Sequence, residues 1–106
     1  MSANWLYLAL AIAMEIVATS ALKESQGLRR LLPSAVALVG YVIAFGALAR
    51  ALRTIPLGVA YAIWSGTGIA VLTLVGVLVY RDTIGLVQGA GIALICAGIA
   101  LVYLAR

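Results

Sequence analysis

Four long apolar stretches, separated by short polar links, constrain the fold of this sequence more than any other feature. Only 9% of the residues are charged and 66% are hydrophobic, whereas an ordinary soluble domain has about 25% charged residues. Such a chain cannot cover itself with polar surface, so we expect an integral membrane protein. The apolar stretches are continuous rather than alternating, which favours spanning helices over the strands of a barrel.

A membrane-spanning helix needs about 20 apolar residues, and the 106 residues accommodate four such helices with short links. We therefore predict an all-α integral membrane protein with a single four-helix transmembrane domain over residues 1–106. The first stretch lacks a basic segment before it and contains a carboxylate, so we expect it to be retained rather than cleaved as a signal peptide. The predicted spans are residues 3–22, 31–50, 57–80 and 84–105.

A single carboxylate, Glu15, lies inside the first apolar stretch. A charge near the middle of a spanning helix costs roughly 2.5 kcal/mol or more, and ionisable groups at this depth usually mark an ion or substrate pathway. The alternative is a protonated Glu15 that makes one structural hydrogen bond between helices. Helical spacing puts Ala11, Ala18 and Thr19 on the same face. These small residues either leave open space beside the carboxylate or let another backbone approach closely.

Aromatic residues form two pairs at helical spacing. Tyr41 and Phe45 are four residues apart in the second span, where packing between helices explains them at least as well as contact with a cation. Tyr61 and Trp64 are three residues apart in the third span, and Ser65 lies four residues after Tyr61. These three residues predict an aromatic surface with hydrogen-bonding tips at mid-membrane depth.

Glycines recur in the third and fourth spans. Gly66 and Gly68 lie near the middle of the third span, where paired glycines permit a bend or allow close helix packing. Gly91 and Gly98 are seven residues apart and predict a small-residue seam for helix association. Residues 85–89 add a GxxxG spacing, which is weak evidence alone because it is common in apolar segments.

Several function classes are excluded by what the sequence lacks. There is no histidine, and Cys96 is the sole cysteine. Zinc sites, histidine-based catalysis and disulfide frameworks within the chain are therefore excluded or nearly so. We expect no metal, no cofactor and no enzymatic activity. The net charge of +4 comes from basic residues scattered at the span ends, which indicates contact with lipid head groups rather than with nucleic acid.

Basic residues are almost evenly divided between the two predicted sides of the membrane, so the positive-inside rule gives almost no preferred orientation. A chain without a preference can insert both ways, and two oppositely inserted copies would supply the inverted repeat that many transporters build within one chain. The side of the chain termini has Arg50, Arg53 and Arg106, and the other side has Lys23, Arg29, Arg30 and Arg81.

Three segments resemble the small multidrug resistance family of bacterial proton-coupled exporters: residues 15–23, 25–31 and, above all, 55–68, which read Ile-Pro-Leu-Gly-Val-Ala-Tyr-Ala-Ile-Trp-Ser-Gly-Thr-Gly. The resemblance covers essentially the whole chain. It implies an antiparallel, dual-topology homodimer of four-helix subunits in the bacterial inner membrane. Its partners would be protons, lipophilic cations and membrane lipid.

The resemblance also implies roles for individual residues. Glu15 matches the site shared by proton and substrate, and its neighbours Ala11, Ala18 and Thr19 belong to that site. The remaining matches are Tyr61 and Trp64 for the aromatic wall, Tyr41 and Phe45 for the lining of the same chamber, Gly66 and Gly68 for the flexing point, and Gly91 to Gly98 for the dimer seam.

The residue at position 18 separates the branches of that family. Guanidinium exporters typically have Trp where this chain has Ala18, whereas the multidrug branch has a small residue followed by Thr, as in Ala18-Thr19. Tyr41 also resembles the multidrug branch. The chain departs from the family pattern where Ala44 replaces a common Ser, which removes a possible polar partner in the chamber. The other departures, Glu24, Leu28 and Arg29, lie in the first link.

The resemblance implies that the protein exchanges protons for a lipophilic cation. A lipophilic cation is attracted by ionised Glu15 and by aromatic faces, and protonation removes the attraction. If the chamber reorients only when it holds protons or a cation, an inward proton gradient drives export of the cation. Three alternatives remain open: a guanidinium or small polyamine exporter, a structural membrane subunit, and a lipid carrier that needs a different partner chain.

Overall fold

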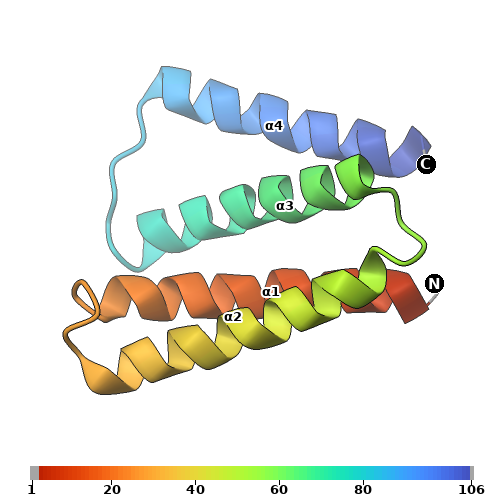
Figure 1. Cartoon of the computed structure of the whole chain (residues 1–106). Helices are drawn as coiled ribbons and strands as arrows, with labels where there is room; N and C mark the ends of the chain where they lie inside the picture. The colour runs from red at the N-terminus through yellow and green to blue at the C-terminus, as the bar shows by residue number, and fades with distance from the viewer. Residues whose placement is uncertain (1–2, 106) are drawn as a thin grey trace. The chain divides into compact units, whose positions relative to one another are not determined.

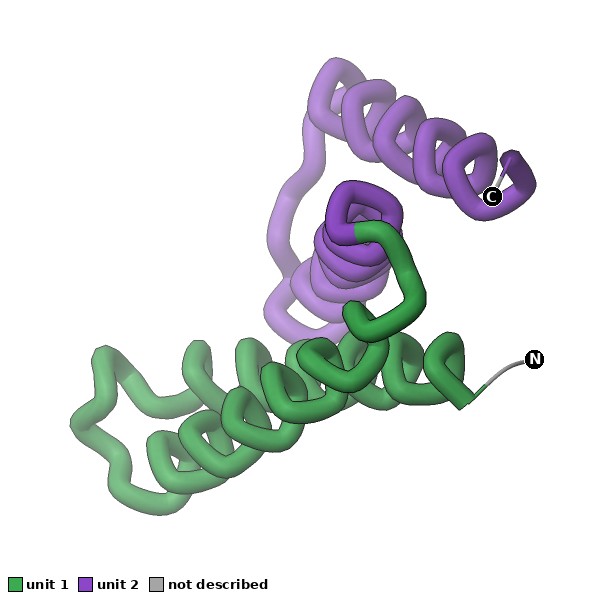
Figure 2. Tube along the Cα trace, turned by 45° about the vertical axis from the view of Figure 1, so that its right-hand side comes forward, with its two compact units in different colours: residues 1–56 green, residues 57–106 purple. Residues whose placement is uncertain are grey.

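The computed structural model describes residues 3–105, which form four helices in chain order (Figure 1). Each helix is long and apolar enough to cross a membrane, which confirms the all-α class and the four predicted spans. The chain divides into two compact units, unit 1 over Met1–Pro56 and unit 2 over Leu57–Arg106 (Figure 2). The single domain over residues 1–106 stays a prediction. The helices are α1 Ala3–Glu24, α2 Leu31–Ala51, α3 Leu57–Leu78 and α4 Leu86–Ala105.

The link between α3 and α4 is longer than the sequence predicts. The third span was expected to reach residue 80 and the fourth to begin at residue 84, but the helices leave residues 79–85 between them. The chain folds back after α3 because the Asp82 N–H donates to the carbonyl of Gly76 at 2.9 Å. The Asp82 carboxylate lies where a Cβ on Gly76 would be, so glycine lets that side chain pack against the end of α3. Gln88 then accepts a hydrogen bond from the Gly85 N–H at 2.9 Å and fixes the start of α4.

The link between α1 and α2 is organised by Ser25, which is buried. Its hydroxyl donates to the Leu22 carbonyl at 2.5 Å and accepts from the Leu28 N–H at 3.0 Å. Gly27 turns the chain with a φ of 75°, and its neighbours Gln26 and Leu28 share this left-handed conformation with φ of 53° and 70°. Side chains other than glycine rarely adopt it, so the bonds to Ser25 hold a strained turn in place.

Unit 1 is an antiparallel pair of helices packed through small residues. A Cβ added at Gly40 of α2 would lie 2.9 Å from the Cβ of Ala18 and 3.4 Å from the carbonyl oxygen of Met14 in α1. The backbones of α1 and α2 therefore meet as closely as glycine and alanine allow. The buried residues of α2 recur every three or four positions, at Ala37, Gly40, Ala44, Ala47 and Ala51, and those of α1 are Leu8, Ala11, Ile12 and Ala18.

The open end of this hairpin is tied by two side-chain contacts. The Asn4 side chain donates to the Thr54 hydroxyl just beyond α2. The guanidinium carbon of Arg50 lies 5.6 Å from the centre of the Tyr7 ring, a cation–π contact. Together with the Ser25 turn, these contacts tie α1 to α2 at both ends of the hairpin. Arg106, which the sequence assigns to this side of the membrane, lies outside the described residues.

Unit 2 is held together where α3 meets the second half of α4. Figure 1 shows α3 and α4 close together at the start of α3 and apart towards their connecting link. Within the close part, the Ile99 side chain fills the space that a Cβ on Gly66 would occupy, with Ile95 beside it. Gly66 thus forms a notch in α3 that receives Ile99 of α4.

The notch predicts an interaction between two substitutions. We expect Gly66→Ala to lower the thermal unfolding midpoint of the purified protein, because overpacking costs about 1–3 kcal/mol. Ile99→Ala alone removes packing, but it makes room for a Cβ at position 66. The double variant should therefore be more stable than the sum of the single effects by about 1 kcal/mol or more.

Gly89→Ala is the matched control for this cycle, because nothing lies within 4 Å of a Cβ at Gly89. That variant measures the gain in helix propensity alone, about 1 kcal/mol. Additive effects of Gly66→Ala and Ile99→Ala would contradict the notch.

Candidate functional site

Glu15 of α1 is joined to α2 through Thr19. The Thr19 hydroxyl donates to Oε1 of Glu15 at 3.1 Å, and the same hydroxyl oxygen lies 2.7 Å from the hydroxyl of Tyr41 in α2. Thr19 follows Glu15 by one helical turn, so the two side chains share a face of α1. Three polar groups therefore meet between two apolar helices.

The second oxygen of Glu15, Oε2, is buried and has no hydrogen-bond partner among residues 3–105. An unsatisfied buried polar atom costs about 1–3 kcal/mol, and more when it is charged. The cost falls when that oxygen gains a proton or a cationic partner. The arrangement can therefore bind and exchange positive charge.

Close packing of α1 and α2 brings these groups together. Ala18 contacts Gly40, so the next residue of each helix, Thr19 and Tyr41, falls within hydrogen-bond distance. Ala11 and Ala18 are fully buried in unit 1. Of the two possibilities that the small residues left open, the close approach of another backbone is the one observed at Ala18.

The two aromatic pairs form as the spacing predicts. Tyr41 and Phe45 are stacked with ring centroids 6.3 Å apart and planes at 23°. Tyr61 and Trp64 meet edge to face at 5.7 Å and 81° in unit 2. Phe45 is 53% exposed and Tyr61 is 59% exposed in the single chain, so about half of each side chain lies on the surface of this chain.

The Ser65 hydroxyl, which was expected to be a polar tip of the aromatic surface, is hydrogen-bonded within its own helix. This hydroxyl donates to the backbone carbonyl of Tyr61 at 2.6 Å, one turn earlier in α3. This bond to the preceding turn is a common way for serine to satisfy its hydroxyl in a spanning helix and often bends the helix slightly. Ser65 therefore contributes to the α3 backbone rather than to the aromatic surface.

The predicted flexing point and seam lie on different helices of unit 2. Gly66 and Gly68 are buried inside α3, which is an unbroken helix. Gly91 and Gly98 are in α4, where a Cβ at either position would meet nothing within 4 Å. Among the residues that the structure describes in α4, none is buried. The flexing of α3 and the association of α4 with a second copy stay predictions.

The packing of Gly40 and the alanines of α2 against α1 was missed by the sequence reasoning. The three- and four-residue spacing from residue 37 to residue 51 was available as a signal, because it marks one stripe of a helix. That spacing does not tell which helix the stripe packs against. Its partner, α1, emerges only in the structure.

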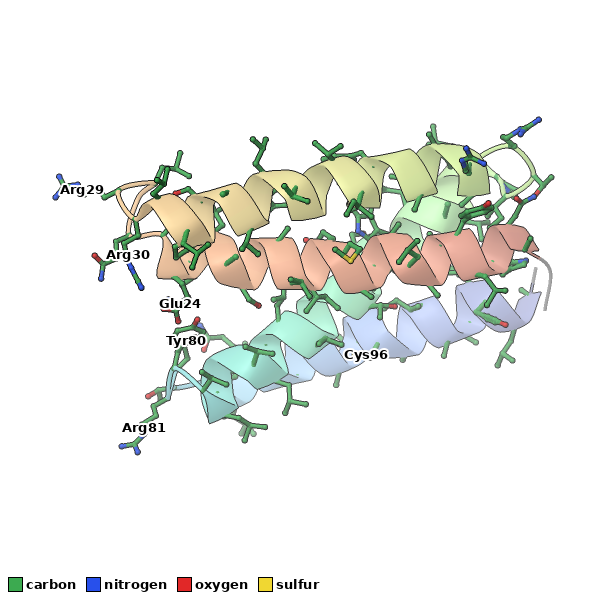
Figure 3. The ribbon with its side chains drawn as sticks, turned by 90° about the horizontal axis from the view of Figure 1, so that it is seen from below. Glu24, Arg29, Arg30, Tyr80, Arg81 and Cys96 are labelled. Atoms are coloured by element: carbon green, nitrogen blue, oxygen red, sulfur yellow. The ribbon has the colours of Figure 1, made fainter. Side chains whose placement is uncertain are left out.

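The basic residues near the first link lie away from the polar chain around Glu15. Figure 3 shows Arg29 and Arg30 directed outward beyond the ends of α1 and α2. Arg30 pairs with Glu24 at 3.7 Å, with both side chains about half exposed, so the pair contributes little to stability. Cys96 lies about midway along α4 in the same view. Among residues 3–105, no cluster of three histidine, cysteine, aspartate or glutamate residues could hold a metal.

Comparison with known proteins decides the family. The model of the Small Multidrug Resistance protein family matches residues 3–95. The chain belongs to this family. As a Small Multidrug Resistance protein whose four helices can each span the membrane, it is a multi-pass protein of the bacterial inner membrane.

Relatives of this Small Multidrug Resistance protein carry names that describe drug resistance or multidrug transport. The chain is 44% identical to the quaternary ammonium compound-resistance protein QacE of Escherichia coli, over 95% of this chain and 92% of that one. It is 46% identical to a multidrug transporter of Pseudomonas aeruginosa with the same coverage. It is 41% identical to the multidrug resistance protein mmr of Mycolicibacterium paratuberculosis, over 95% of each chain.

Proposed function

We propose that the chain is a proton-coupled antiporter that exports lipophilic and quaternary ammonium cations by alternating access, with Glu15 as the shared binding site for proton and cation. The observation that carries the proposal is the buried, unpartnered Oε2 of Glu15 inside a helix of spanning length. The names of QacE and the other relatives support the choice of cation. No chemical conversion of the substrate is involved.

The aromatic residues supply the second half of cation binding. The stacked pair Tyr41 and Phe45 and the edge-to-face pair Tyr61 and Trp64 present ring faces, which attract a cation by about 0.5–2 kcal/mol each. A bulky apolar cation gains from these faces, whereas a small hydrated cation gains much less. The aromatic pairs therefore favour lipophilic substrates.

Alternating access requires an element with two conformations. Bending of α3 at Gly66 and Gly68 is the proposed change, because glycine weakens a helix locally. Ile99 in the Gly66 notch links such a bend to α4. The site would then open to one side of the membrane at a time.

A homodimer of oppositely inserted copies completes the proposed transporter. The near balance of basic residues permits both insertions, and Gly91 and Gly98 leave space on α4 for a second helix. Each copy contributes one Glu15. With two carboxylates in one chamber, a cation and protons would compete for both of them.

The test uses vesicles that contain only this chain and an acidic lumen. We expect external tetraphenylphosphonium to raise the luminal pH at least about tenfold faster than guanidinium at equal concentration, because the aromatic pairs favour the apolar cation. Alkalinisation by guanidinium alone would move the chain to the guanidinium branch. No alkalinisation by either cation would point to a structural subunit or to a carrier that needs a different partner chain.

A further inference from the structure

The hydrogen bonds around Glu15 have a fixed direction. The Thr19 hydroxyl has one proton, and it donates that proton to Oε1 of Glu15. In the 2.7 Å contact between the two hydroxyls, Tyr41 must therefore be the donor and Thr19 the acceptor. We call this ordered pair of donors, Tyr41 to Thr19 to Oε1, the hydroxyl relay.

The relay makes the two carboxyl oxygens of Glu15 unequal. Oε1 already accepts the Thr19 proton, whereas Oε2 is buried without a partner in the described chain. In a protonated carboxyl, the carbonyl oxygen is the better acceptor, so the oxygen that stays bonded to Thr19 keeps carbonyl character. An arriving proton is therefore directed to Oε2.

We propose that Oε2 of Glu15 is the atom at which proton and cation replace each other, while the hydroxyl relay holds Oε1 throughout the cycle. The inference rests on the proposed exchange function and specifies which oxygen of Glu15 takes part in the exchange. Tyr41 is then a positioning residue that acts through Thr19, in addition to any contact between its ring and the cation.

Few other ionisable groups surround this carboxyl within unit 1. Tyr41 is the titratable side chain that reaches it from α2, through Thr19. Along α1, Tyr7 lies eight residues before it and residues 23–24 lie eight and nine residues after it, about 12 Å or more by helical rise. Within unit 1, the relay therefore supplies the hydrogen bond that the Glu15 carboxyl receives.

The first test measures tetraphenylphosphonium binding to the detergent-solubilised protein as a function of pH. Cation binding is lost as the pH falls, because the proton wins the competition for Oε2. Donors to Oε1 stabilise the ionised carboxyl, so their removal should let the proton win at higher pH. We expect Thr19→Val to raise the half-loss pH by about one unit, Tyr41→Phe to raise it by less, and Thr19→Ser to restore it.

A double-variant comparison separates the relay from direct ring contact. If Tyr41 acts through Thr19, then Tyr41→Phe adds no shift in the presence of Thr19→Val. Additive shifts, or a Tyr41→Phe variant with weaker binding at every pH and an unmoved half-loss pH, would overturn the proposal. A wild-type protein that binds the cation without any dependence on pH would instead contradict the proposed exchange function.

Infrared spectroscopy tests which oxygen takes the proton. At low pH the protonated Glu15, identified by its loss in Glu15→Gln, gives one carboxyl C=O stretch. With the proton on Oε2, that carbonyl is Oε1 and is bonded to Thr19, so Thr19→Val should shift the stretch to higher frequency. An unmoved stretch would show that Thr19 does not contact the carbonyl oxygen and would overturn the assignment.

Discussion

Glu15→Gln abolishes the proton release that accompanies tetraphenylphosphonium binding and weakens that binding by about 100-fold, or about 2.7 kcal/mol. Glutamine keeps the size of the side chain and can still accept the Thr19 hydrogen bond. It cannot ionise, so it neither attracts the cation nor releases a proton. The variant should therefore fold normally and lose the exchange.

The measurement is the pH change of a weakly buffered protein solution on addition of the cation, with binding followed by calorimetry. Glu24→Gln is the matched control, because Glu24 is at the end of the same helix and pairs only weakly with Arg30 in the first link. We expect the control to release protons like the wild type. Equal proton release by Glu15→Gln and the wild type would show that Glu15 is not part of the site.

Replacement of both Gly91 and Gly98 by leucine converts the proposed dimer into monomers. Nothing lies within 4 Å of a Cβ at either position, so a side chain can begin at each position without meeting another part of the chain. The two residues are seven apart and fall within about 20° of each other on one face of α4. A second helix packed against that face would be pushed away, and we expect the dimer dissociation constant to rise at least about tenfold, or about 1.4 kcal/mol.

The mass of the detergent-solubilised particle, measured by sedimentation, reports the dimer. Gly89→Leu is the control, because Gly89 is also open and lies about 200° from Gly91 around the same helix. That variant should sediment like the wild type. A dimer that survives the paired leucines and dissociates in Gly89→Leu would mean that the opposite face of α4 forms the seam.

The spans could be predicted because burial in lipid demands continuous apolar helices, whose length the sequence displays directly. The ends of α3 and α4 could not be predicted equally well. They depend on Asp82 folding back over Gly76, a contact between residues six apart that no helical periodicity encodes. The prediction ended the third span two residues too late and began the fourth span two residues too early, so it made the link between them four residues too short.

Glu15 stood out in the sequence because a carboxylate is costly at that depth. The hydrogen-bond partners of Glu15 could be predicted from the sequence only in part. Thr19 lies one turn along the same helix and could be found by spacing, whereas the contact with Tyr41 depends on the register of α2 against α1. That register is set by Gly40 against Ala18, a pair that a pattern along one helix cannot match.

The measurement that tests the central claim most directly is the accumulation of tetraphenylphosphonium by vesicles that contain only this chain. The cation begins at equal concentration on both sides, the lumen is acidic and the membrane potential is held at zero. We predict that the cation accumulates in the lumen above its external concentration as protons leave, and that vesicles with Glu15→Gln or without protein do not accumulate it. An equal final concentration on both sides in wild-type vesicles would contradict proton-coupled exchange.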